Sequence, residues 1–157
     1  MPIPKKLEKF LNENKVKYEP ITHKTVFTAY DKAQTLKVPE KIIGKTLTVK
    51  LDKNYGLVLI PANRNLDKMK FKKTAKVKSM DFVKEVWIKK NLKGVKVGAV
   101  PPFGNLWKMP TIIDRSLMNH PKIIVNAGDW NWSIKINPVI LKKVIQDLII
   151  GNISKVK

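Results

Sequence analysis

The sequence predicts a mixed α/β fold in a single domain. Apolar residues recur at helical spacing near both ends of the chain, whereas residues 45–51 alternate apolar and polar side chains as a half-buried strand does. Short apolar runs separated by Gly and Pro follow, and the hairpin turn after residue 51 implies antiparallel pairing. No repeat or long linker divides the 157 residues, a length that supports one core. We therefore expect one domain over residues 1–157.

In the N-terminal half, helix starts and strand alternation define the elements. Pro4 begins a short amphipathic helix, and Thr28 is expected to cap a second helix with Asp31 in its first turn. That second helix should stop before Pro39. The expected elements are a helix over 4–14, a strand over 16–22, a helix over 28–38, a strand over 45–51, a turn over 52–56 and a strand over 57–60.

In the C-terminal half, lysine-rich helices give way to short strands. Asn65 or Asp67 should open a helix through Phe71, and Ser79 should cap another that ends near Gly94. Strands are expected over 111–113, 123–125 and 133–136. A terminal helix is expected from the Asn137-Pro138 pair through residue 148.

Composition excludes several classes of function. The chain has no cysteine, so it has no disulfide, thiolate metal site or cysteine nucleophile, and its two histidines make a metal centre improbable. Apolar runs are far shorter than the roughly 20 residues that span a membrane, and because polar residues interrupt the first 15 positions we expect no secretory signal. We therefore expect a cytoplasmic monomer with no membrane contact, no metal and no cofactor.

The net charge of +20 favours a polyanionic partner, and nearly all of the charge is lysine. Lysine makes point-charge contacts to phosphate rather than the two-pronged contacts that read bases. The alternative is that the charge reflects a biased composition and a solvated surface. Six lysines gather over residues 68–78, namely Lys68, Lys70, Lys72, Lys73, Lys76 and Lys78.

Three stretches carry a family resemblance over about residues 7–149. The first joins residues 23–33 to the run Gly44-Lys45-Thr46-Leu47-Thr48-Val49, the second is the Gly/Pro loop of residues 94–104, and the third joins 110–114 to 125–128. Together they resemble the YbaK family of aminoacyl-tRNA editing domains, which also occur inserted in bacterial prolyl-tRNA synthetases.

The resemblance implies a barrel-like mixed sheet flanked by helices, and a free-standing deacylase that hydrolyses the ester of a mischarged tRNA without a cofactor. Lys45 matches the family's essential lysine. The loop that follows Gly98 would hold the aminoacyl-adenosine end through its backbone. The candidate substrate-binding residues are His23, Thr28, Gly98, Ala99, Val100, Pro101, Pro102, Asn126 and Gly128.

The tRNA stem would lie on the six clustered lysines, with Trp107 and Lys108 near the acceptor end. Partners implied are aminoacylated tRNA and a synthetase served in trans. Asn126, Ala127 and Gly128 depart from the family's patterns at this point, so the amino acid stays open.

Each candidate also has an ordinary interpretation. A lone lysine is by default a surface residue, a Pro-Pro segment is commonly a turn, and Thr28 is foremost a helix cap. His23 is expected to be a hydrogen-bonding residue rather than a general base. Two other functions also stay open, a catalytically silent RNA-binding module and an esterase or binding protein that does not act on RNA.

Overall fold

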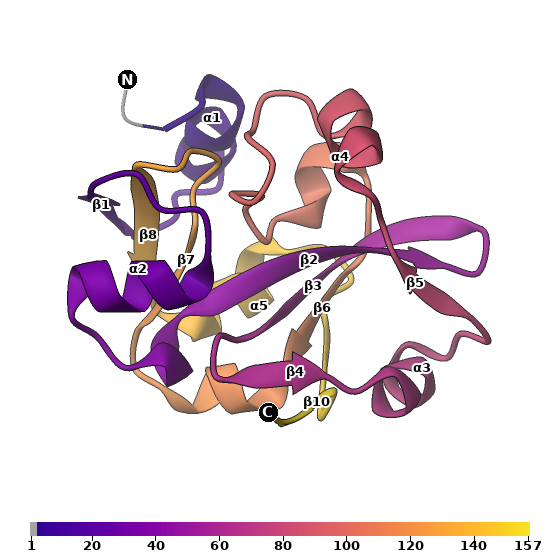
Figure 1. Cartoon of the computed structure of the whole chain (residues 1–157). Helices are drawn as coiled ribbons and strands as arrows, with labels where there is room; N and C mark the ends of the chain where they lie inside the picture. Colours follow the sequence, from indigo (N-terminus) through magenta and orange to yellow (C-terminus); the bar gives the residue numbers. More distant parts are fainter. Residues whose placement is uncertain (1–2) are drawn as a thin grey trace.

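The computed structural model describes residues 3–157, and its centre is a five-stranded mixed sheet (Figure 1). Its order is β5 (Met80–Phe82), β2 (Gly44–Leu51), β3 (Asn54–Pro61), β6 (Thr111–Asp114) and β9 (Ile149–Gly151). β2 pairs antiparallel with β3 and β5, whereas β3–β6 and β6–β9 are parallel. The mixed α/β prediction is confirmed, but the pairing is not purely antiparallel.

Two smaller antiparallel sheets complete the strands. One contains β1 (Glu19–Thr22), β8 (Trp132–Ile136) and β7 (Ile123–Asn126), and the other contains β10 (Ser154–Val156) and β4 (Arg64–Leu66). A single parallel bridge between Ile43 and Ile124 joins β7 to the start of β2. Over residues 3–157 the sheets therefore form no closed barrel.

The helices are short and cover the sheets from several sides (Figure 1). They are α1 (Lys5–Glu13), α2 (Ala29–Leu36), α3 (Lys68–Ala75), α4 (Glu85–Asn91) and α5 (Pro138–Val144), with 3-10 turns at Glu40–Ile42, Gly104–Trp107 and Arg115–Asn119. None of these helices is long and apolar enough to span a bilayer. As expected, Thr28 caps α2 by accepting a hydrogen bond from the Asp31 amide at 3.0 Å, and Asn137 caps α5.

The central sheet separates two apolar cores because side chains alternate across its faces. Leu59 and Ile113 enter a core shared with α1 and α5, whereas Val58, Ile60 and Ile112 pack with Phe71 of α3. All five of these aliphatic side chains are fully buried. The sheet is thus fixed in position from both sides.

Three expectations about local structure are wrong. Ser79 caps no helix: its hydroxyl donates to Asp52, residues 80–82 form β5, and α4 begins only after Lys84. The hairpin turn is shorter than expected, since β3 already begins at Asn54. The terminal helix ends at Val144, and the chain continues into β9 and β10.

Candidate functional site

A cavity of about 190 Å³ opens beside the first residues of β2. The pairing of β2 with β7 does not continue beyond the Ile43–Ile124 bridge, and β5 joins β2 only from Val49 onward. Within the described residues, no strand therefore pairs with this edge of β2 over residues 45–47. The cavity occupies the opening, and α2, the loop at Gly98 and the segment after β7 close it.

Lys32 of α2 is a buried lysine in this cavity. Its side chain is only 6% exposed, and its ammonium donates to Asn126 Oδ1 at 2.6 Å. The Asn126 amide group donates in turn to the Val100 carbonyl at 3.3 Å, so the amide oxygen must face Lys32. Burial lowers the pKa of Lys32 from 10.5 to about 8. This chain of contacts connects α2, β7 and the loop.

Lys45 and Thr46 reach the cavity from β2. Lys45 is half-buried, and burial lowers its pKa, with Lys157 adding repulsion and Glu40 acting in the opposite direction. The buried hydroxyl of Thr46 has no hydrogen-bond partner among residues 3–157. Consecutive strand residues point to opposite faces, yet both line the cavity because it lies along an open edge.

The loop between Val97 and Gly104 closes the cavity through its backbone. Gly98 has a φ of +85°, which L side chains rarely adopt, so glycine suits this turn. The Gly128 amide donates to the Ala99 carbonyl at 2.8 Å, and the Lys96 amide donates to the Gly128 carbonyl at 2.9 Å. These bonds hold the loop against the segment after β7.

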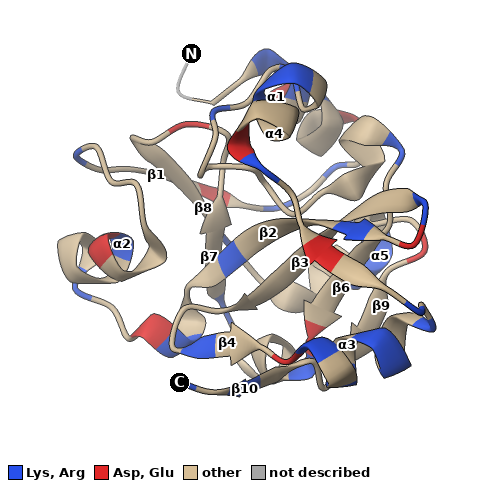
Figure 2. Cartoon of the chain, turned by 45° about the vertical axis from the view of Figure 1, so that its right-hand side comes forward, with Lys and Arg blue, Asp and Glu red and all other residues tan. Residues whose placement is uncertain are grey.

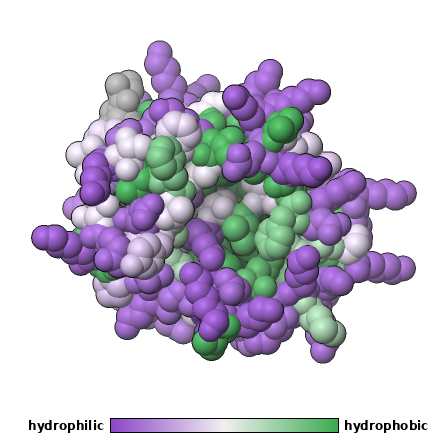
Figure 3. All heavy atoms as spheres, in the orientation of Figure 1, coloured by the Kyte–Doolittle hydropathy of each residue, from purple (hydrophilic) through white to green (hydrophobic). Residues whose placement is uncertain are grey.

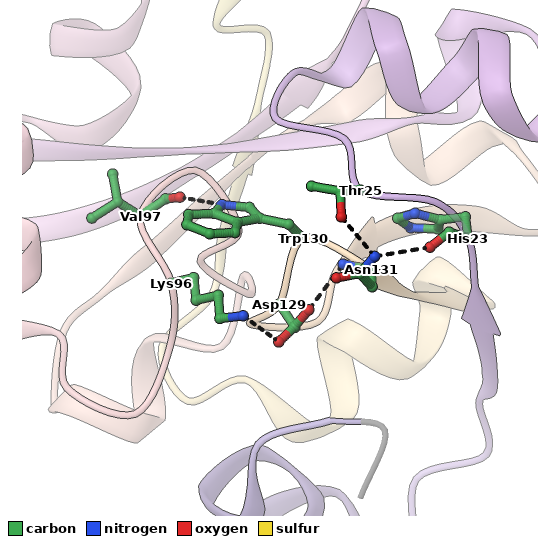
Figure 4. A network of polar contacts seen from close by, with 7 residues as sticks. All are labelled: His23, Thr25, Lys96, Val97, Asp129, Trp130 and Asn131. Atoms are coloured by element: carbon green, nitrogen blue, oxygen red, sulfur yellow. Dashed lines mark hydrogen bonds and ion pairs between the residues drawn. The ribbon is translucent and has the colours of Figure 1, made fainter.

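Trp130 forms the cavity wall next to Gly98, and polar contacts fix its ring (Figure 4). Its indole nitrogen donates to the Val97 carbonyl at 2.7 Å, and the Phe27 ring meets it edge-on at 5.1 Å. Lys96 Nζ lies 4.9 Å from the Trp130 ring centre and 3.0 Å from Asp129 Oδ2.

Asp129 also lines the cavity and is held in its charged form. Burial, the largest influence, raises its pKa, but the Asn131 amide and the Lys96 ammonium outweigh burial and leave the pKa below its usual value. Because Asp129 is paired with Lys96, it does not neutralise Lys32 by direct contact.

The structure brings some of the sequence-predicted substrate residues to the cavity. Lys45, Thr28, Gly98, Ala99 and Asn126 line it. The Thr28 hydroxyl is engaged by its own helix as the cap, as expected from the ordinary interpretation.

The other predicted substrate residues do not line the cavity. His23 bonds through Nε2 to the Ser133 hydroxyl at 2.9 Å and through Nδ1 to the Lys24 carbonyl. Burial lowers the pKa of His23. The Val100 carbonyl accepts from Asn126, Pro101 and Pro102 are buried residues of the loop itself, and the Gly128 amide donates to the Ala99 carbonyl of the loop.

The lysine cluster lies away from the cavity. Figure 2 shows the basic residues of α3 in blue, with Lys76 and Lys78 following the helix. Phe71 of this helix packs with Val49 and Met80, at the end of β2 where β5 pairs with it. The cavity is at the other end of β2, about 20 Å away at about 3.3 Å per strand residue. The cluster therefore lies too far away to contact a group bound in the cavity, and its role in tRNA binding stays a prediction.

Trp107 and Lys108 belong to a different hollow. It measures about 710 Å³ and includes Tyr55 and Trp87, whose rings stack at 4.1 Å. Lys6 Nζ lies 5.3 Å from the Trp107 ring centre, and the buried Trp107 nitrogen has no partner among residues 3–157. Adjacency in sequence to the Gly98–Gly104 loop thus does not bring Trp107 into the cavity.

A second, apolar hollow of about 280 Å³ adjoins the cavity and shares Thr46 and Gly98 with it. Leu47, Ile88 and Val100 contribute to its lining. Figure 3 shows the hollowed surface above β2, with hydrophobic atoms inside and hydrophilic side chains around it. Within residues 3–157, no group of three His, Asp or Glu side chains is placed to hold a metal ion.

The most important residue that the sequence interpretation missed is Lys32. It lies three residues after Ala29 and four before Leu36, on the same face of α2. Both of these residues pack against a buried cluster that contains Ala33. The position of a lysine within an apolar helical face was the sequence signal that could have identified Lys32 as buried. Thr46, Asp129 and Trp130 were also not assigned to the cavity, since they come together only in the fold.

Solved structures show the same fold at low sequence identity. The chain aligns with hypothetical protein APE2540 at a TM-score of 0.86 and 21% identity, covering 96% of this chain and 100% of that chain. It aligns with a candidate trans-editing enzyme for prolyl tRNA synthetase at 0.80 and 19%, covering 96% and 95%. No curated protein matches.

The family comparison is more specific than these structural likenesses. A model of the aminoacyl-tRNA editing domain matches residues 23–144, which contain every residue that lines the cavity. The match extends over more than three-quarters of the chain. This protein therefore belongs to the aminoacyl-tRNA editing domain family.

Proposed function

We propose that this chain is a trans-acting aminoacyl-tRNA deacylase that hydrolyses the ester between a wrong amino acid and the tRNA 3′ end. The observation that carries the proposal is the cavity at the open edge of β2, where Lys45, the Gly98 loop and Asn126 converge within the matched family region. We propose further that residues 1–157 act as one editing domain, as a cytoplasmic monomer.

The size of the cavity supports entry of the aminoacyl group alone. Its volume of about 190 Å³ is below the roughly 300–1,000 Å³ of pockets that enclose whole small-molecule ligands, so it fits a part of the substrate and not a whole nucleotide. The terminal adenosine would then lie outside, and the adjoining apolar hollow offers a surface for its base. Exclusion by size is the way in which an editing site removes small wrong amino acids.

Lys45 is the residue we assign to the ester. As water attacks the carbonyl carbon, negative charge develops on the carbonyl oxygen, and an ammonium at the cavity stabilises that charge. The ester C–O bond breaks, the amino acid leaves with a new carboxylate, and the ribose oxygen takes a proton. No cysteine is present and His23 lies outside the cavity, so we assign activation of the water to the free ribose hydroxyl of the substrate.

The proposal is tested by measuring the deacylation of a panel of mischarged tRNAs, which includes the proline tRNA charged with wrong amino acids. Lys45→Ala should reduce kcat/KM at least about 100-fold, because one preorganised oxyanion donor is typically worth 10²–10³ in rate. Lys50→Ala, an exposed lysine of the same strand, is the matched control and should retain the wild-type rate. Equal turnover by wild type and Lys45→Ala would remove Lys45 from the mechanism.

A silent tRNA-binding module is the second candidate, favoured by the net charge of +20. It predicts tight, salt-sensitive binding of aminoacylated tRNA with no hydrolysis of any member of the panel. The same panel, assayed for both binding and turnover, distinguishes the two functions. Because one structural neighbour is described as a trans-editing enzyme for prolyl tRNA synthetase, that synthetase is the first to examine as a partner.

A further inference from the structure

Lys32 gives the cavity a feature that ester hydrolysis does not require. Lys32 is 6% exposed, and its ammonium has three N–H donors, of which one reaches Asn126 Oδ1. Within residues 3–157, no other acceptor bonds to it and no carboxylate forms an ion pair with it. Two donors of a buried cation are therefore available to a ligand in the cavity.

A structural role does not explain this arrangement. Burying an ammonium costs several kcal/mol unless opposite charge and hydrogen bonds compensate, and a methionine would fill the same space without that cost. Asp129, the acid in the cavity wall, is engaged by Lys96 at 3.0 Å. Lys45 is a second cation in the lining, so the charge that faces an entering group is positive.

We propose that the cavity selects an aminoacyl group whose short side chain ends in a carboxylate, the aspartyl class, with Lys32 as the residue that recognises it. The inference depends on the proposed deacylase function for its biological meaning, but it concerns binding in the cavity. A carboxylate would accept from the two remaining Lys32 donors and from the Thr46 hydroxyl, which is buried without a partner within residues 3–157. Each of these groups would then be satisfied.

Position distinguishes this role from phosphate binding. Lys45 is half-buried and Lys32 almost fully buried, so a backbone phosphate that stays outside the cavity meets Lys45 first. Asn126 fixes the direction of the Lys32 ammonium, because its own amide group is held by the Val100 carbonyl. The recognition site is thus preorganised from α2, β7 and the loop.

The test measures binding and turnover separately. Binding uses amide-linked, non-hydrolysable aminoacyl-adenosines that carry aspartate, asparagine or alanine. The asparagine analogue has nearly the same shape as the aspartate analogue but no charge on its side chain. Binding of adenosine 5′-monophosphate measures the affinity for a phosphate group. Wild type should bind the aspartyl analogue at least about 100-fold more tightly than the alanyl one, since a site built for a polar group rejects a ligand that lacks it. Lys32→Met should reduce this ratio to near 1.

A second measurement follows the uptake of a proton on binding. With a pKa of about 8, Lys32 is about half protonated at pH 8, and a bound carboxylate should complete its protonation. Calorimetry in buffers of different ionisation enthalpy should therefore show uptake of about half a proton with the aspartyl analogue and less with the alanyl one. His23, Lys45, Asp129 and its partner Lys96 are the other titratable groups around the site, and a carboxylate would also act on Lys45. Loss of the difference between the two analogues in Lys32→Met would assign it to Lys32, whereas its persistence would assign it to another group.

The outcomes separate the two proposals. Preference for alanyl over aspartyl, in binding and in turnover, would overturn the inference and leave the deacylase function intact. Lys32-dependent aspartyl binding without hydrolysis of any aminoacyl-tRNA would support the inference and reject the deacylase. Loss of affinity for adenosine 5′-monophosphate equal to that for the aspartyl analogue in Lys32→Met would assign Lys32 to phosphate and overturn the inference.

Discussion

Substituting Lys32 by Met should change how the stability of the protein depends on pH. A pKa lowered from 10.5 to about 8 means that the folded state disfavours the ammonium by about 3 kcal/mol relative to the unfolded state. Methionine is similar in length and carries no proton in either state. The pH-dependent part of the free energy of unfolding that belongs to Lys32 should therefore disappear in Lys32→Met.

The sign follows from proton binding. Well below pH 8, Lys32 is protonated in both the folded and the unfolded wild type. The full free-energy cost of burying its ammonium is then present and does not vary with pH. Between pH 8 and 10.5 the unfolded chain binds more protons than the folded one, and stability from this group rises with pH. Between pH 7 and pH 10 the gain is about 2.5 kcal/mol, from the two pKa values.

Urea unfolding of wild type and Lys32→Met at pH 7, 8, 9 and 10 measures this gain. The difference in unfolding free energy between the two proteins should shift by about 2.5 kcal/mol in favour of the wild type as the pH rises. In Lys32→Met the Asn126 Oδ1 atom loses its hydrogen-bond donor, which lowers the unfolding free energy by an amount that does not vary with pH. Lys41→Met, at an exposed lysine, is the control and should run parallel to the wild type. A difference in unfolding free energy between wild type and Lys32→Met that does not change with pH would refute the lowered pKa of the buried Lys32 ammonium.

Three further predictions concern the cavity and the charged surface. Gly98→Val should lower the turnover of larger aminoacyl groups before smaller ones, and add backbone strain of about 1–2 kcal/mol at a positive φ; equal losses for all substrates would show that the loop is not the sieve. Thr46→Val should stabilise folding by about 1 kcal/mol in urea unfolding, because it removes a buried hydroxyl without a partner in the described chain, and should weaken ligand binding. Replacing Lys68, Lys73 and Lys78 by Gln should lower the slope of log affinity against log salt by about 0.7–0.9 per phosphate contact and spare kcat; parallel slopes would mean a solvated surface.

Local signals predicted much of the fold. The alternation of Leu47, Val49 and Leu51 identified β2, and the Thr28 and Asn137 caps identified two helix starts, because each depends on residues close in sequence. The Ser79 prediction failed for a long-range reason. Its hydroxyl and amide are both bonded to Asp52, 27 positions away, which leaves residues 80–82 to pair with β2.

The short C-terminal strands could not be seen in the same way. β9 and β10 are each three residues long, and β9 pairs in parallel with β6, whose residues lie more than 30 positions earlier. Asp114 contributes to this region: one carboxylate oxygen accepts from the Ser116 amide, and the other accepts from the Ile153 amide at 3.0 Å. Only the second contact connects distant segments, and no local pattern contains it.

The site was predicted where the family pattern was local and missed where it was not. Lys45 and the Gly98 loop stand in short motifs, whereas the partner of Lys32 is 94 positions away. A buried cation cannot be inferred until the residue that faces it is known. Conversely, Pro101, Pro102 and Gly128 belong to the motif but do not line the cavity. Gly128 instead donates its amide to the carbonyl of Ala99, which does line it.

The position of the cavity follows from the way two sheets meet. β7 and β2 run parallel at one bridge, Ile43 with Ile124, and two residues further along each strand stand Lys45 and Asn126. Had the pairing continued, backbone amides and carbonyls would have satisfied one another and left no opening. Because it stops, side chains line the opening instead, and within the described chain two donors of the Lys32 ammonium and the Thr46 hydroxyl have no partner there. The end of the strand pairing thus explains both the opening and the unpaired polar groups on which the proposed recognition of a carboxylate depends.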